Sequence, residues 1–193
     1  MDLEKIKNLR EKTGAGVVDV KKALEKSKGN ETLALEIIRK KGQEIAAKKT
    51  GRSAKEGILG VYVHSTNKVG AMVKLFCETD FVGRNEEFKE LAKDLAMHIT
   101  ASSPEYLNPE DVPSSRIEKE RDIWREQFLN QGKKETMLDK ILEGKEKKFR
   151  EEIALMAQPF VKNPEITVKE LIQEKIGKIG ENIQVGEFFR FEI

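Results

Sequence analysis

The sequence predicts an α+β protein in which a small three-helix unit precedes a core containing a three-stranded antiparallel sheet. Three observations support this prediction. Apolar residues recur at helical spacing through the first fifty residues, two segments between residues 58 and 77 have the composition of strands, and residues 183–191 alternate as a third strand does. Helical periods occupy most of the sequence between these strands.

Three helices are expected in the first fifty residues. The first has an apolar face and ends at the glycine-rich segment 13–16, because glycine frees the backbone to turn. The second begins at Val17 and ends near Gly29. Asn30 is a good N-cap for the third, and Gly42 is a plausible end for it. We therefore expect a helical domain over residues 1–50, a basic linker over 51–56 and an α+β core over 57–193.

The first two strands of the core form a predicted hairpin. Residues 58–64 are rich in β-forming side chains, and residues 65–68 can form a turn. The second strand runs from Val69 to Cys77, and its apolar residues alternate with the intervening positions, which is the period of a strand. We expect the two strands to be antiparallel.

The rest of the core is predicted to be mostly helical, with breaks at proline and glycine. One helix occupies about 85–102, and a loop with Pro104 and Pro109 follows. Later helices occupy about 114–132 and 134–158, a break falls at Pro159 and Pro164, and a last helix starts at Thr167 and ends at Gly177 and Gly180. The candidate buried positions of the 114–132 helix are Ile117, Ile123, Trp124 and Phe128.

Composition excludes several classes of protein. Charged residues make up 36% of the chain, but the two signs nearly cancel and leave a formal charge of +2, so we expect no direct nucleic-acid partner. The one cysteine excludes an internal disulfide, and no apolar run approaches the roughly 20 residues that span a bilayer. The first residues lack the pattern of a secretory signal. We therefore expect a cytoplasmic protein without a membrane partner.

No catalytic constellation is recognisable. His64 and His98 have no ligand at metal-binding spacing, and Cys77 has no obvious base beside it, so a packed thiol is favoured over a nucleophile. The segment 177–180 resembles a phosphate loop only superficially, since it follows a helix and precedes a strand. We expect no enzyme activity, no catalytic residue, no metal and no cofactor.

The segment Thr79-Asp80-Phe81-Val82 lies between the hairpin and the next helix. A large apolar ring at this corner is either core packing or a tip that inserts into a partner. Composition alone favours packing, because aromatic rings in loops commonly tuck back into the core. Asp80 is equally compatible with an acidic residue at a helix start.

Four blocks, in order along the chain, resemble the elongation factor Ts family. The first runs from Leu9-Arg10 through the glycine turn to Leu24, and the second is Glu78–Val82 with Arg84-Asn85. The third joins His98-Ile99 to Pro104-Glu105-Tyr106-Leu107, and the fourth runs from Gly180-Glu181-Asn182 to Phe191. Together they extend over nearly the whole sequence, so chance agreement is a poor explanation.

The resemblance implies a function for both the helical domain and the core. Residues 1–50 would adopt a fold resembling the ubiquitin-associated domain and dock on the GTP-binding domain of elongation factor Tu. The core would be an α+β domain whose sheet lies beside helices. The chain would bind the GDP-bound and nucleotide-free forms of that partner and promote GDP release by disturbing its magnesium and phosphate site. The short length resembles family members that pair as homodimers. The implied partner-binding residues are Arg10, Val17, Val18, Lys21, Thr79, Asp80, Phe81 and Val82.

Three alternatives stay open at this point. Val17 and Val18 stand where family members often have methionine, and either valine could instead belong to the core of the helical domain. The basic segment 40–55 could bind nucleic acid, although such a run is more commonly a solvated face. The helical domain could also serve as a general adaptor for other proteins.

Overall fold

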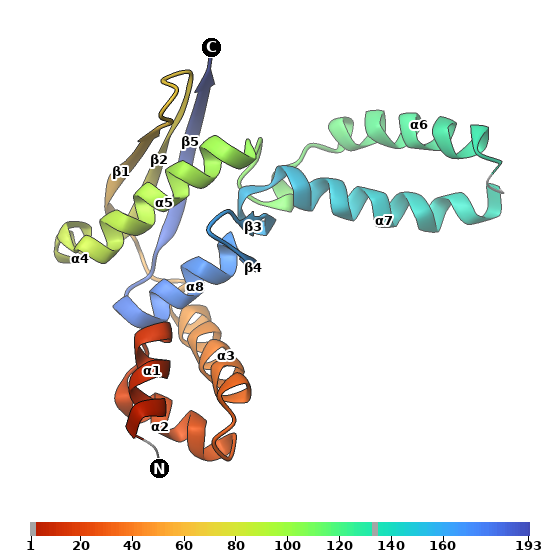
Figure 1. The fold of residues 1–193 in the computed structure, drawn as a ribbon. Coiled ribbons are helices and arrows are strands. Elements are labelled where there is room, and N and C mark those ends of the chain that lie inside the picture. Colours follow the sequence, from red (N-terminus) through yellow and green to blue (C-terminus); the bar gives the residue numbers. More distant parts are fainter. Residues whose placement is uncertain (1–2, 133–134) are drawn as a thin grey trace. The chain divides into compact units, whose positions relative to one another are not determined.

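The computed structural model describes residues 3–132 and 135–193 and has the predicted mixed α+β fold (Figure 1). Residues 1, 2 and 134, where predicted segments begin, lie outside the described residues. Strands β1 (Glu56–Val63), β2 (Val69–Cys77) and β5 (Gln184–Glu192) form an antiparallel sheet in the order β1-β2-β5. The chain divides into two compact units. The first comprises the residues up to Gly60, Lys74–Ala92 and Lys169–Gly186, and the second comprises Val61–Val73, Lys93–Val168 and Glu187–Ile193.

Three helices begin the first unit, as predicted: α1 (Leu3–Thr13), α2 (Val17–Lys26) and α3 (Glu31–Lys49). Asn30 caps α3, since its Oδ1 accepts a hydrogen bond from the Leu33 N–H at 3.2 Å. The helices share a small buried cluster of apolar side chains, which is the stripe that the periodicity predicted. Its members are Leu9, Val20, Ala23, Leu24 and Ala34.

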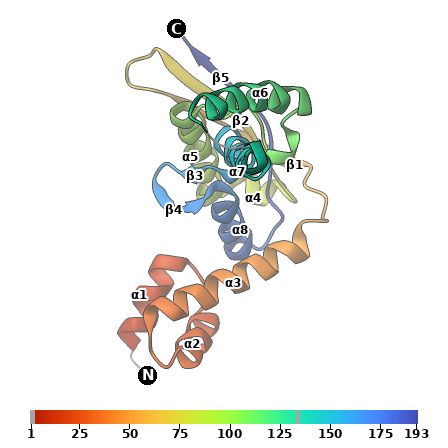
Figure 2. The same cartoon turned by 90° about the vertical axis from the view of Figure 1, so that its right-hand side faces the viewer.

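Gly42 does not end α3, so that prediction was wrong. The helix continues to Lys49 and packs beside α8 (Val168–Ile179), as Figures 1 and 2 both show. Gly177, also predicted as a helix end, lies inside α8, and a Cβ placed on it would come within 3.2 Å of the Gly42 Cα. Gly177 therefore permits close packing of α8 on the backbone at Gly42, and α8 ends at Ile179, just before Gly180, whose φ of +86° favours glycine.

The predicted alternation of β2 is confirmed, because Ala71, Val73, Leu75 and Cys77 are all buried. Within the first unit, β1 passes close to α5 (Glu86–Ser102) at Gly60, where any Cβ would overlap the carbonyl of Ala92. The predicted apolar stripe of α5 is buried as well: Phe88, Leu91, Leu95 and Ile99.

The second unit contains the long helices α6 (Ser114–Asn130) and α7 (Glu135–Ile153), which form a hairpin in Figure 1. Trp124 packs on Leu138 and Leu142, and its ring meets that of Phe149 edge-on at 5.6 Å. Ile123 was predicted to be buried but is 49% exposed. A hairpin of two helices buries only a narrow stripe of each, and Trp124 rather than Ile123 lies on that stripe.

Short elements fill the segments predicted as proline-containing breaks. Residues Pro109–Asp111 form the 3-10 helix η1. The helix predicted to continue to about residue 158 ends at Ile153 as α7, and Leu155–Ala157 form the separate 3-10 helix η2. Strands β3 (Pro159–Phe160) and β4 (Asn163–Thr167) pair antiparallel, a hairpin that the sequence did not predict. Proline is tolerated there because a two-stranded ribbon leaves edges that need no N–H donor.

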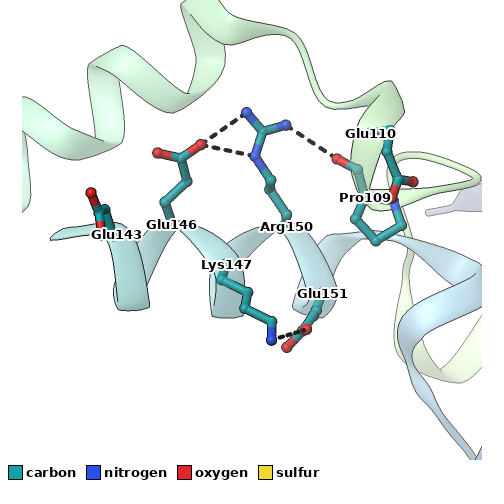
Figure 3. A pocket seen from close by; sticks show the side chains of 7 residues that line it. All are labelled: Pro109, Glu110, Glu143, Glu146, Lys147, Arg150 and Glu151. Atoms are coloured by element: carbon teal, nitrogen blue, oxygen red, sulfur yellow. Dashed lines mark hydrogen bonds and ion pairs between the residues drawn. The ribbon is translucent and has the colours of Figure 1, made fainter. Parts of the chain in front are cut away.

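A groove of about 610 Å³ lies beside α7, and Figure 3 shows the seven side chains that line it. Among these side chains the Arg150 guanidinium pairs with Glu146 at 3.0 Å and donates to the carbonyls of Pro109 and Val112. Lys147 lies 3.9 Å from Glu151. Arg150 therefore ties α7 to the η1 loop, which is a structural task.

Candidate functional site

Phe81 stands on an exposed corner immediately after β2. Residues Asp80–Arg84 form the short helix α4, so the predicted turn is helical. The Phe81 side chain is 79% exposed, and Asp80 pairs with Arg84 at 3.0 Å across one turn of the helix. The side chain is therefore not packed in the core, which composition alone had favoured. Val82 is half-buried beside it, and Thr79 is exposed at the start of the helix.

A carboxylate from the segment after α8 holds the start of this corner. Glu181 Oε2 accepts the N–H groups of Glu78 at 3.1 Å and Thr79 at 3.0 Å. Its Oε1 accepts the Thr79 hydroxyl at 2.7 Å. Thr79 is the N-cap of α4, yet its side chain makes no capping bond to the helix, and its hydroxyl donates to Glu181.

A second set of contacts supports the first. The Asn182 N–H donates to Glu78 Oε1 at 2.6 Å, and its side-chain amide donates to the Arg52 carbonyl at 2.7 Å. The Arg52 guanidinium lies 3.6 Å from the other oxygen of Glu78. Asn182 is only 2% exposed, and both its N–H and its side-chain amide are paired.

Cys77 lies buried at the end of β2, where its thiol donates to the Thr79 carbonyl at 3.1 Å. Burial raises the pKa of the thiol, and the negative charge of Glu181 raises it further. The neutral thiol is therefore favoured, which agrees with a packing role at the base of the corner.

The helix that follows the corner is tied to α8 by charge. Lys175 and Lys178 both place their Nζ atoms 2.7 Å from Glu87 Oε1. Burial alone would raise the pKa of Glu87, but the hydrogen bonds and charges of the two lysines outweigh it and lower that pKa. The stem of Lys178 also covers Gly14, leaving no room for a side chain there.

The four predicted docking residues of the helical unit, residues 1–50, all reach its surface. Arg10 and Val17 line a groove of about 500 Å³ with α1 side chains and Lys178. Val18 and Lys21 are exposed on α2, one turn apart. Val17 is 47% exposed and Val18 62%, whereas Val20 is the α2 valine that enters the core. The structure thus brings Arg10 and Val17 into one groove and leaves Val18 and Lys21 on the adjoining surface.

The basic segment before β1 is partly committed to internal contacts. Lys49 donates its ammonium to the Gly180 carbonyl, and Arg52 pairs with Glu78. These contacts favour the structural interpretation of the segment over nucleic-acid binding.

One face of the sheet in the second unit is apolar and exposed. We call the exposed side chains Val61, Val63, Met72, Phe189 and Phe191 the apolar sheet face. Four of them, all except Phe189, line a groove of about 280 Å³ together with Ile193. Alternate residues of a strand share a face, so Phe189 lies on the same side as Phe191.

Within residues 3–132 and 135–193, no group of three or more His, Cys, Asp or Glu side chains is arranged to hold a metal ion. In the same part of the chain, none of the helices combines the length and apolarity that crossing a membrane requires.

Glu181 and Asn182 are the site residues that sequence reasoning missed as contributors to the corner. They follow Phe81 by about a hundred residues, and neither periodicity nor local spacing connects them to it. The available signal was their place in the fourth family-like block, beside the turn-forming Gly180.

Comparison with known proteins supports one assignment. The family model described as elongation factor TS matches residues 4–193. Elongation factor Ts of Carboxydothermus hydrogenoformans is 52% identical over 188 residues, which cover 97% of this chain and 87% of the relative. That of Thermodesulfovibrio yellowstonii is 52% identical over 97% of this chain and 94% of the relative. That of Herpetosiphon aurantiacus is 48% identical over 100% of this chain and 98% of the relative. The chain therefore belongs to the elongation factor Ts family of translation factors.

Proposed function

We propose that the chain is a guanine-nucleotide exchange factor for elongation factor Tu. It binds the GDP-bound and nucleotide-free forms of that partner and promotes GDP release by disturbing the magnesium and phosphate site. The observation that carries the proposal is the exposed ring of Phe81, presented beside Asp80 on the α4 corner. Family membership supports the choice of partner.

The ring can account for part of the exchange energy. Moving a phenylalanine side chain from water into an apolar pocket yields about 1.5–3 kcal/mol. Each 1.4 kcal/mol corresponds to about a factor of ten in an equilibrium constant, so Phe81 can offset roughly tenfold to hundredfold of nucleotide affinity. Asp80 would place a negative charge near the phosphates, which repels them and further weakens their binding. Thr79 and Val82 flank the pair and would complete the contact.

The helical unit would supply additional binding energy without entering the nucleotide site. Arg10 and Lys21 offer charge, while Val17 and Val18 offer an exposed apolar contact. We propose the division predicted from the sequence: residues 1–50 dock on the GTP-binding domain, 51–56 link, and 57–193 carry the exchange corner and the dimer contact.

No bond is made or broken in this mechanism, so we propose that the protein is not an enzyme and needs no cofactor. Coupling between binding sites is reciprocal, so GDP must weaken the binding of the factor to elongation factor Tu by as much as the factor weakens the binding of GDP. Nucleotide then displaces the factor by mass action.

We also propose that the chain forms a homodimer through the apolar sheet face. Five large apolar side chains exposed on adjacent strands form a patch of the kind that soluble proteins usually cover. A two-fold axis would place this face against its own copy, an arrangement that is self-complementary.

The decisive experiment replaces Phe81 by alanine and times the release of a fluorescent GDP analogue from elongation factor Tu by stopped flow. We expect release to slow by roughly tenfold to hundredfold at a fixed factor concentration, the amount that the lost burial predicts. Leu129→Ala, which truncates an exposed apolar side chain on α6, is the matched control and should release at the wild-type rate. Unchanged release by Phe81→Ala would remove the ring from the mechanism.

A further inference from the structure

The direction in which Phe81 points depends on the start of α4. The ring is mostly exposed, so packing against its own chain does little to orient it. Helix α4 has only five residues, and a helix this short is not stable without outside contacts. Whatever fixes residues 78–79 therefore fixes the ring.

Three of the contacts that fix these residues come from one carboxylate. Glu181 accepts two backbone N–H groups and one hydroxyl from Glu78 and Thr79, at 2.7–3.1 Å. Hydrogen bonds to a charged acceptor are stronger than neutral ones. The Thr79 hydroxyl donates to this anchor, and its side chain makes no capping bond to the helix that it precedes.

The carboxylate is itself held in place. Gly180 has a φ of +86°, which turns the chain after α8 and brings Glu181 toward the end of β2. The next residue, Asn182, is buried and returns a hydrogen bond from its N–H to the Glu78 carboxylate at 2.6 Å. The two segments thus exchange acceptors, each carboxylate binding the backbone of the other segment.

We propose that Glu181 is a positioning residue for nucleotide exchange: by anchoring Thr79, it holds Phe81 in the orientation that enters the partner. This inference rests on the proposed function, since it assigns a task to Glu181 in the same reaction. Without the anchor, residues 79–81 sample other conformations. The GDP release rate then falls in proportion to the fraction of molecules in which Phe81 keeps the orientation that enters the partner.

The first test replaces Glu181 by alanine in the full-length protein and measures GDP release against factor concentration. We expect the maximal release rate to fall about tenfold, while the half-saturating concentration, set mainly by the helical unit, changes by less than about twofold. Glu181→Gln should retain most of the rate, because an amide oxygen can still accept both N–H groups. Glu126→Ala, on exposed α6, controls for the loss of a charge and should match the wild type.

The second test combines Glu181→Ala with Phe81→Ala. If Glu181 acts by orienting the ring, its removal lowers the GDP release rate about tenfold when Phe81 is present and hardly at all in the Phe81→Ala background. In the same samples, hydrogen exchange at the Glu78 and Thr79 amides should accelerate in Glu181→Ala alone and stay slow in Phe81→Ala alone.

The outcomes separate the two proposals. Unchanged release by Phe81→Ala overturns the proposed function and this inference with it. Two outcomes overturn the role of Glu181 alone, provided that Phe81→Ala slows release. In the first, Glu181→Ala releases GDP at the wild-type rate. In the second, the effects of the two substitutions are independent and multiply. Should Glu181→Ala fail to fold, Glu181→Asp takes its place in the cycle, since the shorter side chain cannot reach all three donors.

Discussion

At the scale of the residue, His98 shows how hydrogen bonding fixes the state of a titratable group. The Val161 N–H donates to His98 Nδ1 at 3.2 Å, so this nitrogen carries no proton. Nε2–H then donates to the Gln158 side-chain oxygen at 2.9 Å, while the amide nitrogen of Gln158 donates to backbone carbonyls of Ser102 and Glu152. The buried imidazole is therefore neutral, and the histidine is structural.

This arrangement predicts a pH dependence of stability. Burial lowers the pKa of His98 below its ordinary 6.5, and the bond from Nε2–H to Gln158 opposes this only in part. Above pH 6.5 neither state is protonated at this site. Below it, the unfolded chain binds a proton that the folded one does not, so the free energy of unfolding falls as pH drops, by up to about 1.4 kcal/mol per pH unit.

Denaturant unfolding of His98→Gln between pH 7.5 and 5 checks this prediction. The variant should be less stable at pH 7.5, since glutamine replaces the ring contacts incompletely. Its free energy of unfolding should, however, fall less steeply as the pH drops, because the contribution of His98 is gone. His64→Gln makes the same substitution at the other, exposed histidine and serves as the control. An undiminished slope in His98→Gln would refute the assignment.

At the scale of the element, the contact between α3 and α8 depends on two glycines in different ways. A Cβ on Gly177 would lie 3.2 Å from backbone Gly42, whereas a Cβ on Gly42 would meet nothing within 4 Å. Alanine at Gly42 should therefore stabilise the protein by up to about 1 kcal/mol through helix propensity. Alanine at Gly177 gains the same propensity but forces two helix backbones apart, at a cost of about 1–3 kcal/mol.

Thermal unfolding of the two variants tests this asymmetry. We expect Gly42→Ala to melt at or above the wild-type temperature and Gly177→Ala to melt below it. Gly144→Ala, in exposed α7 with open space around the added methyl group, reports the propensity gain alone and should resemble Gly42→Ala. Equal melting temperatures for the Gly42 and Gly177 variants would contradict the close packing of α3 on α8.

At the scale of the whole molecule, the apolar sheet face predicts the oligomeric state. Replacing Phe191 by glutamate would place an unpaired carboxylate in the proposed dimer contact, where burial of the charge costs several kcal/mol. We expect the dimer dissociation constant to rise by roughly a hundredfold or more. Sedimentation velocity over a range of concentrations measures this, with Phe81→Ala as a control that should remain dimeric. A wild-type chain that is monomeric at every concentration would refute the dimer.

The sequence by itself determined the features that depend on local chemistry. Hydrophobic period placed the three N-terminal helices, the buried alternation of β2 and the buried stripe of α5, because each side chain's direction follows from its position in the repeat. Four family-like blocks likewise identified the family, and with it the candidate residues of both the helical domain and the core. The β3–β4 hairpin escaped prediction because its prolines resemble a break.

Only the tertiary structure decided what depends on distant neighbours. Composition favoured a buried Phe81, and the fold exposes it on a helix too short to recognise from its sequence. Gly42 and Gly177 look like helix ends until each is seen beside the other. Glu181 meets Thr79 across a hundred residues of chain. Propensity describes a residue among its sequence neighbours, whereas packing and hydrogen bonding are settled by whichever residues the folded chain brings together.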